Sequence, residues 1–480
     1  MRLSQRIRVL PWLLFAVVGG GAGSAPILAA DTGLHTYYID EPVFGGQAYI
    51  AEAGQRGKPT LVLVHGLNDS MELWRPFIPA LARHFHVISF DLPGFGRSTK
   101  ANKLYSPENY VAFIRHVLER YAQPQIRLVG HSLGANIALH YAGTYPAQVE
   151  RLALVSVAGV LHRLAYTQFL THFGIRQLPE FYGGQGRELK GLADRVLGVL
   201  ADNAALIELG EQYMLSQAPW REHVLGGHPS AIAAHAMMLS DVTESLSRQS
   251  VPTLLIWGAE DRVTPLRTGK LLAATLANAG LAVIEGAAHV PLRDRRQQFA
   301  QLLLPYLVSA AAERDALLAG HRYQRASSQG ANAERVGRCQ HERDKVFHGT
   351  YKLIVIEHCT NIRLEQVVAD RVSILHSDVT IEASVIESTG TALSLEASEV
   401  IATATQVQGQ PALRLLDSSL DMAGGRLRSA GDAVLSMAGP QTPSSTTTGS
   451  RILFSVSRLD SKHSQRYLHG PVLLSAGQGL

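Results

Sequence analysis

A serine between two glycines is the first feature of this sequence that could do chemistry. Ser132 lies in GHSLG (130–134), directly after the apolar run IRLV (126–129) and at the start of a helical pattern over 132–145. This strand–turn–helix context is typical of a nucleophile elbow, a tight turn that lifts a serine hydroxyl off a sheet at the positive end of a helix. We therefore expect Ser132 to act as a nucleophile.

A serine hydroxyl is a weak nucleophile at neutral pH, so it needs a base that is oriented by an acid. His289 lies in GAAHVPLRD (286–294), just after the last predicted strand, and Asp261 lies in WGAEDRVTP (257–265), after the strand before it. The chain order Ser132, Asp261, His289 and the position of each after a parallel strand fit a catalytic triad. Glu260 is the alternative acid.

The negative charge that develops on a substrate carbonyl also needs donors that are fixed in advance. HGL (65–67) follows the apolar run TLVLV (60–64), from which one backbone N–H can reach the elbow. We expect the amides of Leu67 and Leu133 to form this oxyanion hole. His65 and His131 are expected to support their loops by hydrogen bonding.

Short apolar runs that alternate with helical patterns must position these residues. They are typical of strands buried in a parallel sheet, and a β-hairpin is predicted ahead of them over 35–40 and 47–53. The predicted strands are 60–64, 87–90, 126–129, 151–157, 253–257 and 281–285. The 93 residues from Ala158 to Ser250 are too many for one crossover, so we expect an inserted helical cap over 158–250.

Five motifs in chain order carry a family resemblance: HG (65–66), DLPGFGRS (91–98), GHSLG, WGAEDRVTP and the late His289. Together they resemble the α/β-hydrolase superfamily over about residues 35–310, in its capped branch of esterases, lipases and carbon–carbon bond hydrolases. Ser132 at the nucleophile position argues against epoxide hydrolases and dehalogenases, which use Asp there. The resemblance implies acyl transfer to Ser132 from a small-molecule or lipid-like ester, then hydrolysis by water activated through His289. Asp91 is expected to be a turn residue.

The predicted cap is rich in aromatic and Met side chains, which either line an apolar pocket or form the cap's own core. They are Tyr166, Phe169, Phe173, Phe181, Tyr182, Tyr213, Met214, Trp220, Met237 and Met238. Its histidines (His162, His172, His223, His228 and His235) lack the spacing of a zinc site. We therefore expect neither a metal nor another cofactor.

A second domain is predicted after residue 310. Residues 311–338 read as a helix followed by a polar linker, and 339–480 as an all-β domain. Five segments align there, at 351–359, 371–379, 392–400, 412–420 and 451–459, with the first four ending 20, 21 and 20 residues apart and the fifth 39 later. This period predicts a β-solenoid that resembles a right-handed parallel β-helix, with a protruding loop at 439–450. A small β-sandwich is the alternative.

Two other functions compete with ester hydrolysis. The solenoid could bind or modify a polysaccharide through an outward column formed by His358, Asp378, Glu399 and Ser419, or the whole chain could be a scaffold with a vestigial triad. Because all three triad residues precede Ser309, truncation near Ser327–Gly330 is predicted to leave an active hydrolase domain, with few contacts crossing the linker.

The only two cysteines, Cys339 and Cys359, are 20 residues apart, which is one solenoid period. If they occupy one column of neighbouring coils, they are about 4.8 Å apart, within the range that a disulfide tolerates. We therefore predict a Cys339–Cys359 disulfide. The alternative is a buried Cys359 and a free thiol at Cys339.

The first thirty residues predict export. Arg2, Arg6 and Arg8 precede the apolar run VLPWLLFAVV (9–18) and a Gly/Ala/Ser stretch that ends before Asp31, so 1–30 reads as a signal peptide. The mature protein is expected in the periplasm or secreted; an uncleaved signal would be its one membrane anchor. Without those three arginines the formal charge falls from +4 to +1, which gives no electrostatic case for nucleic-acid binding.

Overall fold

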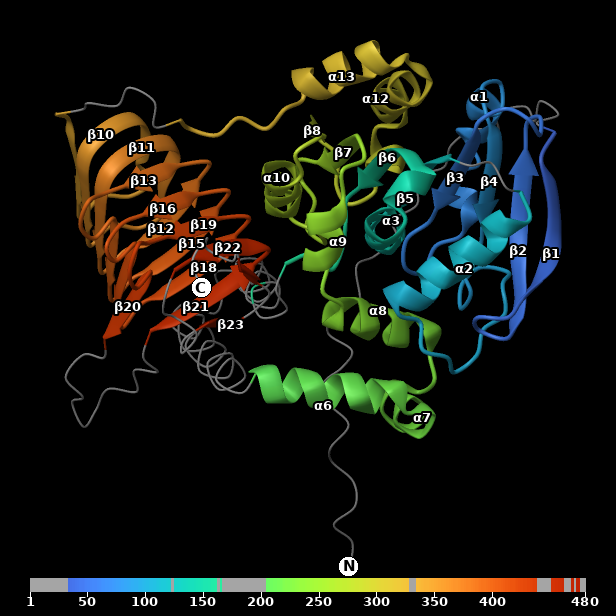
Figure 1. The fold of residues 1–480 in the computed structure, drawn as a ribbon, viewed down its shortest axis with the longest axis horizontal. Helices are drawn as coiled ribbons and strands as arrows, with labels where there is room; N and C mark the ends of the chain where they lie inside the picture. Colours follow the sequence, from blue (N-terminus) through green and yellow to red (C-terminus); the bar gives the residue numbers. More distant parts are fainter. Residues whose placement is uncertain are drawn as a thin grey trace, which may run out of the picture.

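The computed structural model has an α/β part, residues 33–321, and an all-β solenoid, residues 336–474 (Figure 1). It describes residues 33–121, 125–161, 165, 204–327, 334–437, 450–461, 468–469 and 472–474. The predicted signal peptide, most of the cap's first half and nearly all of the predicted loop at 439–450 lie outside these ranges. So do His162, Tyr166, Phe169, His172, Phe173, Phe181 and Tyr182.

An eight-stranded sheet forms the centre of the α/β part, in the order β1-β2-β4-β3-β5-β6-β7-β8. The strands are β1 (His35–Glu41), β2 (Gly46–Ala53), β3 (Thr60–Val64), β4 (His86–Phe90), β5 (Ile126–His131), β6 (Val149–Val155), β7 (Thr253–Gly258) and β8 (Ala279–Ile284). The predicted hairpin is the antiparallel pair β1–β2, and β3 to β8 are parallel. The predicted α/β fold with a mainly parallel sheet is therefore confirmed.

Helices cover both faces of the sheet because its central strands are apolar on both sides. Helices α2 (Pro107–Glu119), α3 (Leu133–Thr144) and α10 (Leu266–Thr275) contribute to one hydrophobic core, and α1 (Ile78–Leu81), α11 (Pro291–Asp294), α12 (Arg296–Val308) and α13 (Ala311–Gly320) to the other. The hydroxyl of Ser106 caps α2 by accepting the Asn109 N–H, and Pro107 fits the first helical position. Helix α13, at the position of the helix predicted ahead of the polar linker, packs Leu318 into the second core.

Between residue 204 and β7, the chain is mainly helical. Helices α6 (Ala204–Ser216), α7 (Ala218–Leu225), α8 (Pro229–Leu239) and α9 (Thr243–Arg248) lie there, as the predicted cap requires. Helix α9 packs closely on α3, since a Cβ at Gly143 would lie 2.6 Å from the Cα of Ser245. Among the described helices, none is both long and apolar enough to cross a membrane.

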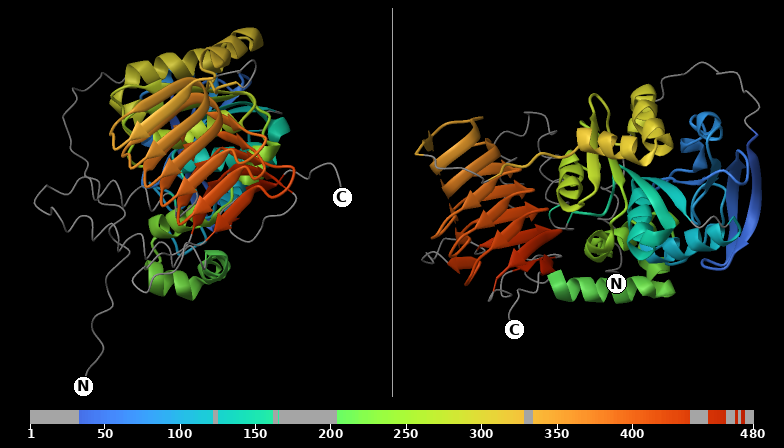
Figure 2. Two further views of the ribbon diagram at one scale, coloured as in Figure 1. Left: turned by 90° about the vertical axis from the view of Figure 1, so that its left-hand side faces the viewer. Right: turned by 45° about the horizontal axis from the view of Figure 1, so that its top comes forward.

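The C-terminal part is a solenoid of parallel strands in three columns, which Figure 2 shows from two sides. The first column is β12 (Asp378–Glu382), β15 (Glu399–Thr403), β18 (Ser419–Ala423), β21 (Arg451–Ser455) and β23 (Leu468–His469); the second is β13 (Val385–Glu387), β16 (Gln406–Gln408), β19 (Arg426–Arg428), β22 (Ser457–Asp460) and β24 (Val472–Leu474). The third is β9 (Val336–Gln340), β10 (Val346–Glu357), β11 (Ile362–Leu375), β14 (Leu393–Glu396), β17 (Leu413–Leu416) and β20 (Val434–Met437), and the long strands β10 and β11 reach all three.

The corners of the solenoid explain the recurring serines of the repeat. Several corners have a left-handed residue, such as Ala397 (φ 46°), followed by a buried serine: Ser377, Ser384, Ser398, Ser418 or Ser457. The Ser398 hydroxyl donates to the carbonyl of Glu396 (2.7 Å) and accepts the N–H of Ser377 in the previous coil (3.1 Å). The bend frees backbone groups from the strand ladder, and the hydroxyl at such a corner satisfies them.

Two details of the predicted repeat are wrong. The segment 451–459 was aligned with 412–420, but the structure pairs Leu420 with Ile452, so the fifth segment lies one strand further along its coil. The insertion around 438–449 therefore falls within a coil, between β20 and β21. The solenoid also begins at Val336 rather than at residue 339.

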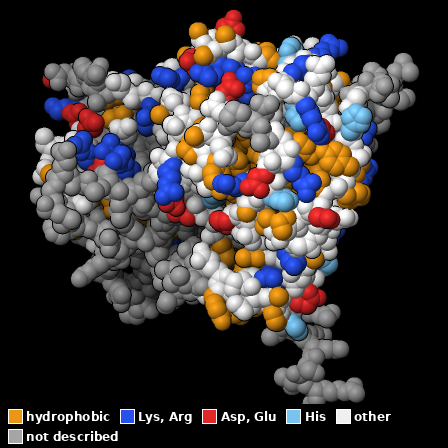
Figure 3. Space-filling view, turned by 45° about the vertical axis from the view of Figure 1, so that its right-hand side comes forward, with side chains coloured by type: hydrophobic (Ala, Val, Ile, Leu, Met, Phe, Trp, Pro, Cys, Tyr) orange, Lys and Arg blue, Asp and Glu red, His pale blue; other side chains and the backbone are white. Residues whose placement is uncertain are grey.

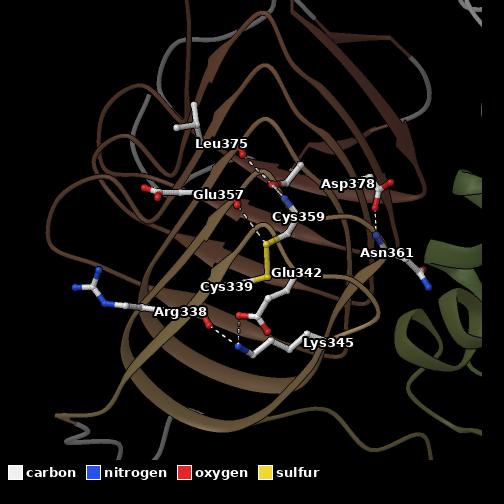
Figure 4. The surroundings of a disulfide bond; sticks show 10 residues. Arg338, Cys339, Glu342, Lys345, Glu357, Cys359, Asn361, Leu375 and Asp378 are labelled. Atoms are coloured by element: carbon white, nitrogen blue, oxygen red, sulfur yellow. Dashed lines mark hydrogen bonds and ion pairs between the residues drawn. A yellow bond between two sulfur atoms is a disulfide. The ribbon is translucent and has the colours of Figure 1, made fainter.

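Cys339 and Cys359 are joined by a disulfide inside the first coil (Figure 4). Their Cα atoms are 6.6 Å apart, which is more than one strand spacing. Contrary to the expected register, Cys339 pairs with Ile356 in the ladder, and Cys359 lies beyond the corner at His358. The bond therefore ties the terminal strand β9 to the next corner.

We expect thiol titration of the unreduced, denatured chain to find no free thiol. Because the bond closes a 20-residue loop, Cys339→Ala should lower the free energy of unfolding of the solenoid by about 3 kcal/mol. Far-UV circular dichroism during urea unfolding measures this loss. The double variant with Cys359→Ala is the control and should match the single one; two free thiols per wild-type chain would contradict the bond.

The expectation that few contacts join the two parts is wrong. Backbone and side chains after α13 lie against the solenoid: the N–H of Ala326 donates to the carbonyl of Ala383 (2.8 Å), and the Tyr323 hydroxyl donates to Glu382 (3.1 Å). Ala423 and Val456 of the solenoid belong to the same hydrophobic cluster as α2, α3 and α10. The two parts therefore share a packed apolar interface.

Candidate active site

Ser132 lies at the sharp turn between β5 and α3. Its φ of 54° and ψ of −116° are strained for a residue with a side chain, as a nucleophile elbow requires. The flanking glycines are needed because a Cβ at Gly130 would lie 2.2 Å from the carbonyl oxygen of Gly134, and one at Gly134 would lie 2.4 Å from those of Val64 and His65. The glycines let strand, turn and helix approach closely.

The structure brings the three predicted triad residues into one chain of contacts. The Ser132 hydroxyl lies 3.0 Å from His289 Nε2, and His289 Nδ1 lies 3.0 Å from Asp261 Oδ2 and 3.2 Å from Oδ1. The Asp261 side chain is fully buried and that of His289 is 18% exposed, so the base is open to a substrate while the acid is not. Glu260, the alternative acid, is exposed.

Asp261 is held by the loop that follows it. Its Oδ1 accepts the N–H groups of Val263 (2.9 Å) and Thr264 (2.8 Å), and its Oδ2 accepts the Thr264 hydroxyl (2.8 Å). Burial raises the pKa of Asp261, but the hydrogen bonds from His289 and Thr264 outweigh it, so the net pKa is lowered. The acid is therefore a carboxylate at neutral pH, in position to hold the Nδ1–H of His289.

Leu67 and Leu133, the expected oxyanion donors, lie on either side of the elbow. Leu133 is the first residue of α3, and a Cβ at Gly66 would lie only 3.1 Å from the Cβ of Ser132, so the Gly66–Leu67 peptide adjoins the nucleophile. His65 Nε2 accepts the N–H of Leu92 (2.9 Å), which leaves Nδ1–H to donate to the Gly66 carbonyl (2.7 Å). Because a peptide is planar, this bond also fixes the direction of the Leu67 N–H.

His131 holds the backbone of the base. It is buried beneath the site, and its Nε2 lies 2.9 Å from the carbonyl oxygen of His289, to which it donates. Burial, with a smaller effect of the nearby His289, lowers the pKa of His131 to about 3. The ring is therefore neutral at physiological pH and supports the catalytic loop without adding a charge.

Three contacts around the site had no counterpart in the sequence prediction. Thr264 binds Asp261, Arg293 forms an ion pair with Asp69 (2.9 Å), and the Ser230 hydroxyl of α8 donates to Asn68 beside Leu67. A Thr three residues after a loop Asp is a recognisable turn pattern, so Thr264 had a local signal. The other two contacts join distant segments and had none.

The described cap residues divide between core and surface. Met237 is buried, Trp220 packs partly buried against the main core, and Tyr213 and Met214 are 67% and 43% exposed. Helix α8 lies beside the elbow, since its Ser230 binds Asn68, next to Leu67, and a Cβ at Gly159 would lie 2.7 Å from Cγ of Met237. Within the described ranges, no three His, Cys, Asp or Glu side chains gather into a group that could hold a metal ion.

The alternative site on the solenoid is assembled only in part. Asp378, Glu399 and Ser419 are register partners in neighbouring coils, as expected. His358 is not in their column: its ring stacks between those of His341 and His376, at 5.0 and 4.9 Å. Asp378 also accepts the backbone N–H of Asn361 and so has a structural role at a corner (Figure 4).

Buried neutral histidines make the α/β part sensitive to acid. Burial is the main cause that lowers the pKa of His65, His131 and His140, so these groups take up protons in the unfolded chain before they do in the folded one. Stability is therefore complete above pH 6.5 and is lost as the pH falls, by up to about 1.4 kcal/mol per pH unit for each histidine.

We expect the free energy of unfolding to fall between pH 7 and pH 5, with His131 alone contributing about 2 kcal/mol. Urea unfolding followed by tryptophan fluorescence measures it, because all four tryptophans precede residue 258. His131→Gln, which retains an N–H donor, should show a shallower pH dependence. A flat profile in the wild type would contradict buried neutral histidines.

Comparison with known proteins agrees with this geometry. Residues 59–295 match the family model described as the alpha/beta hydrolase fold. The chain is 30% identical over 270 residues to the uncharacterized hydrolase YugF of Bacillus subtilis, covering 55% of this chain and 96% of the relative.

Two further relatives have named activities. Human monoacylglycerol lipase ABHD6 is 25% identical, over 52% of this chain and 76% of the relative. The 2-hydroxy-6-oxononadienedioate/2-hydroxy-6-oxononatrienedioate hydrolase of Paraburkholderia phymatum is 28% identical, over 52% of this chain and 88% of the relative. With a serine elbow and the matching fold, the chain is a serine hydrolase that belongs to the α/β-hydrolase fold family.

Proposed function

We propose that this chain is an exported serine hydrolase that cleaves a carboxylic ester, with the solenoid as its accessory domain. The observation that carries the proposal is the unbroken series of contacts from Asp261 through His289 to the Ser132 hydroxyl, at 3.0 Å each. This arrangement suits acyl transfer, in which a base must accept the serine proton as the hydroxyl attacks.

The reaction follows from the positions of these groups. Ser132 Oγ attacks the ester carbonyl, its proton passes to His289 Nε2, and the amides of Leu67 and Leu133 bind the resulting oxyanion. The C–O bond to the alcohol then breaks, and the alcohol leaves with the proton from His289. Water attacks the acyl–Ser132 ester in the same way, with His289 as base, and releases the acid.

The test is turnover of p-nitrophenyl esters of graded acyl length by the purified full chain. We expect hydrolysis by the wild type, with a preferred length that indicates the substrate class, and none by Ser132→Ala. A parallel assay with 2-hydroxy-6-oxo-dienoates tests carbon–carbon bond cleavage; one relative is named as a hydrolase of compounds of this kind. Cleavage of dienoates with no ester turnover would replace the ester proposal.

Export is proposed from the basic and apolar pattern of residues 1–30 and from the cysteine pair, since disulfides form in oxidising compartments. Cell fractionation and N-terminal sequencing test it; we expect a periplasmic or secreted chain that begins near Asp31. An intact N-terminus in the membrane fraction would indicate an anchor instead.

A polysaccharide partner for the solenoid is tested by pull-down on insoluble glycans, with Asp378→Ala/Glu399→Ala as the matched variant. Retention of the wild type alone would support glycan targeting, and equal behaviour of the two proteins would argue against this column. A nucleic-acid partner is not proposed. On the face drawn in Figure 3, outside its grey residues, Lys and Arg are interspersed with Asp and Glu and form no continuous basic surface.

A further inference from the structure

Helix α10 connects the catalytic acid with the solenoid. The acid loop, residues 259–265, runs from the end of β7 through Asp261 directly into α10. One side of α10 packs on the sheet, where a Cβ at Gly269 would lie 2.8 Å from the ring of Trp257. The opposite side, with Arg267 and Lys270, faces the first column of the solenoid (Figures 1 and 2).

Arg267 is bound by two neighbouring coils at once. Its Nη1 and Nη2 donate to the two carboxylate oxygens of Asp421, at 2.5 and 3.0 Å, and its Nε donates to the Thr403 hydroxyl at 2.9 Å. Nη2 also donates to the carbonyls of Asp421 (3.0 Å) and Ala402 (3.2 Å). The two charged side chains are only 18% and 10% exposed. A largely buried, bidentate pair fixes orientation far better than a surface ion pair does.

The apolar contact beside this pair is equally close. Gly424 is the left-handed residue at a corner of its coil. The equivalent residues in the two preceding coils are Ala383 and Ala404. A Cβ at Gly424 would lie 3.1 Å from the Cα of Leu271 and 3.2 Å from its carbonyl oxygen. The backbone of the solenoid thus lies directly on the backbone of α10, one turn after Arg267, and α10 cannot move without the solenoid.

The path from Arg267 to the triad is short. The N–H of Thr268 donates to the Pro265 carbonyl (2.7 Å) in the first turn of α10, and Trp257 Nε1 donates to the Thr264 carbonyl (2.8 Å). Thr264 itself binds Asp261 through its N–H and hydroxyl, and its Oγ1 lies 3.3 Å from His289 Nδ1. A displacement of this first turn therefore moves the groups that hold the carboxylate.

We propose that the solenoid positions the acid of the triad, and that Arg267, clamped by Asp421, is the positioning residue. The solenoid is then a part of the catalytic unit, because its coils fix the start of α10 and, through Thr264, the distance between Asp261 and His289. The proposal rests on the proposed triad chemistry. The proposal predicts that replacing Arg267 lowers kcat and leaves substrate binding unchanged, because the guanidinium of Arg267 binds only residues of the solenoid.

The test compares Arg267→Ala with the wild type in the full chain. We expect kcat for a p-nitrophenyl ester to fall on the order of 10–100-fold, since a shift of about 1 Å in a positioned group has an effect of this size. KM should stay within about twofold, as for interactions made in the transition state. The control is Lys270→Ala, which removes the ion pair with Glu382 (2.6 Å) one turn further along the same interface; its kcat should match the wild type.

A second comparison separates positioning from a general loss of structure. In an Asp261→Asn background, Arg267→Ala should lower kcat by no more than about threefold, because the carboxylate that it positions is absent. An equal fold-loss in both backgrounds would overturn the proposal, as would an equal effect of Lys270→Ala. If Arg267→Ala unfolds by circular dichroism, Asp421→Asn replaces it, since it removes the charge at nearly constant volume.

Labelling with a fluorophosphonate distinguishes the two proposals. In this reaction Ser132 Oγ forms a bond to phosphorus, the P–F bond breaks, fluoride leaves, and the serine proton passes to His289. A wild type that does not react would overturn both the triad chemistry and the positioning role. A wild type that reacts at the same rate as Arg267→Ala would leave the triad chemistry intact and overturn the positioning role alone.

Discussion

Ester turnover is expected to disappear when Ser132 is replaced by alanine, with kcat reduced about 10⁴–10⁶-fold, because the variant lacks the atom that attacks the carbonyl. His289→Ala should show a loss of the same order, since His289 Nε2, 3.0 Å from the hydroxyl, is the base. Replacing both residues should cost little more than replacing either, because they act as one unit.

The measurement is initial-rate kinetics on the preferred p-nitrophenyl ester, with circular dichroism to show that the fold is intact. Ser247→Ala is the matched control, since Ser247 is an exposed serine that binds the Glu244 carbonyl far from the elbow in sequence. It should retain wild-type kinetics. Full activity in Ser132→Ala would refute the assignment of the nucleophile.

Asp261→Asn should reduce kcat on the order of 10⁴-fold, although the shape of the side chain is kept. The amide loses the negative charge, and it can turn an NH₂ group toward Nδ1, which favours the tautomer of His289 that cannot accept the Ser132 proton at Nε2. Fluorophosphonate labelling and steady-state kinetics should fall together, because both require an activated hydroxyl.

Glu260→Gln is the sharpest control for this experiment, because the same change is made one residue earlier on an exposed side chain. It should leave kcat and KM unchanged. A silent Asp261→Asn together with an impaired Glu260→Gln would assign the acid to Glu260 and would mean that the loop rearranges when substrate binds.

The sequence predicted most accurately what is set by local pattern. The elbow was recognisable because Gly130, Ser132 and Gly134 all meet steric demands of one turn, and the strands because each is a short apolar run. His65 and His131 were expected only to support loops. Their distinct roles, one on the Gly66 carbonyl and the other on that of His289, depend on which nitrogen faces which segment.

The errors share a different cause. Strands in different columns have similar apolar residues. After an insertion, the segment 451–459 therefore aligns equally well with the strand of the first column and with the strand of the third column. The composition of the polar linker does not indicate that α10 contacts the solenoid. The partners of Arg267 in α10, Thr403 and Asp421, are 136 and 154 residues away in the sequence. Contacts of this kind leave no trace in the spacing of either segment, and independence of the two parts was inferred from the linker alone.

The register of the first column has a consequence for how this chain can change in length. Asp421 occupies the position that is Thr380 and Ile401 in the two coils before it and Leu453 in the coil after it. One coil alone among these four therefore offers a carboxylate to Arg267. Whole coils can be added or lost beyond β21 without disturbing that pairing, whereas deletion of a coil between the linker and β18 would place an aliphatic or neutral side chain opposite the guanidinium. The number of coils after β21 can therefore change without loss of the Arg267–Asp421 pair, whereas the number of coils before β18 cannot.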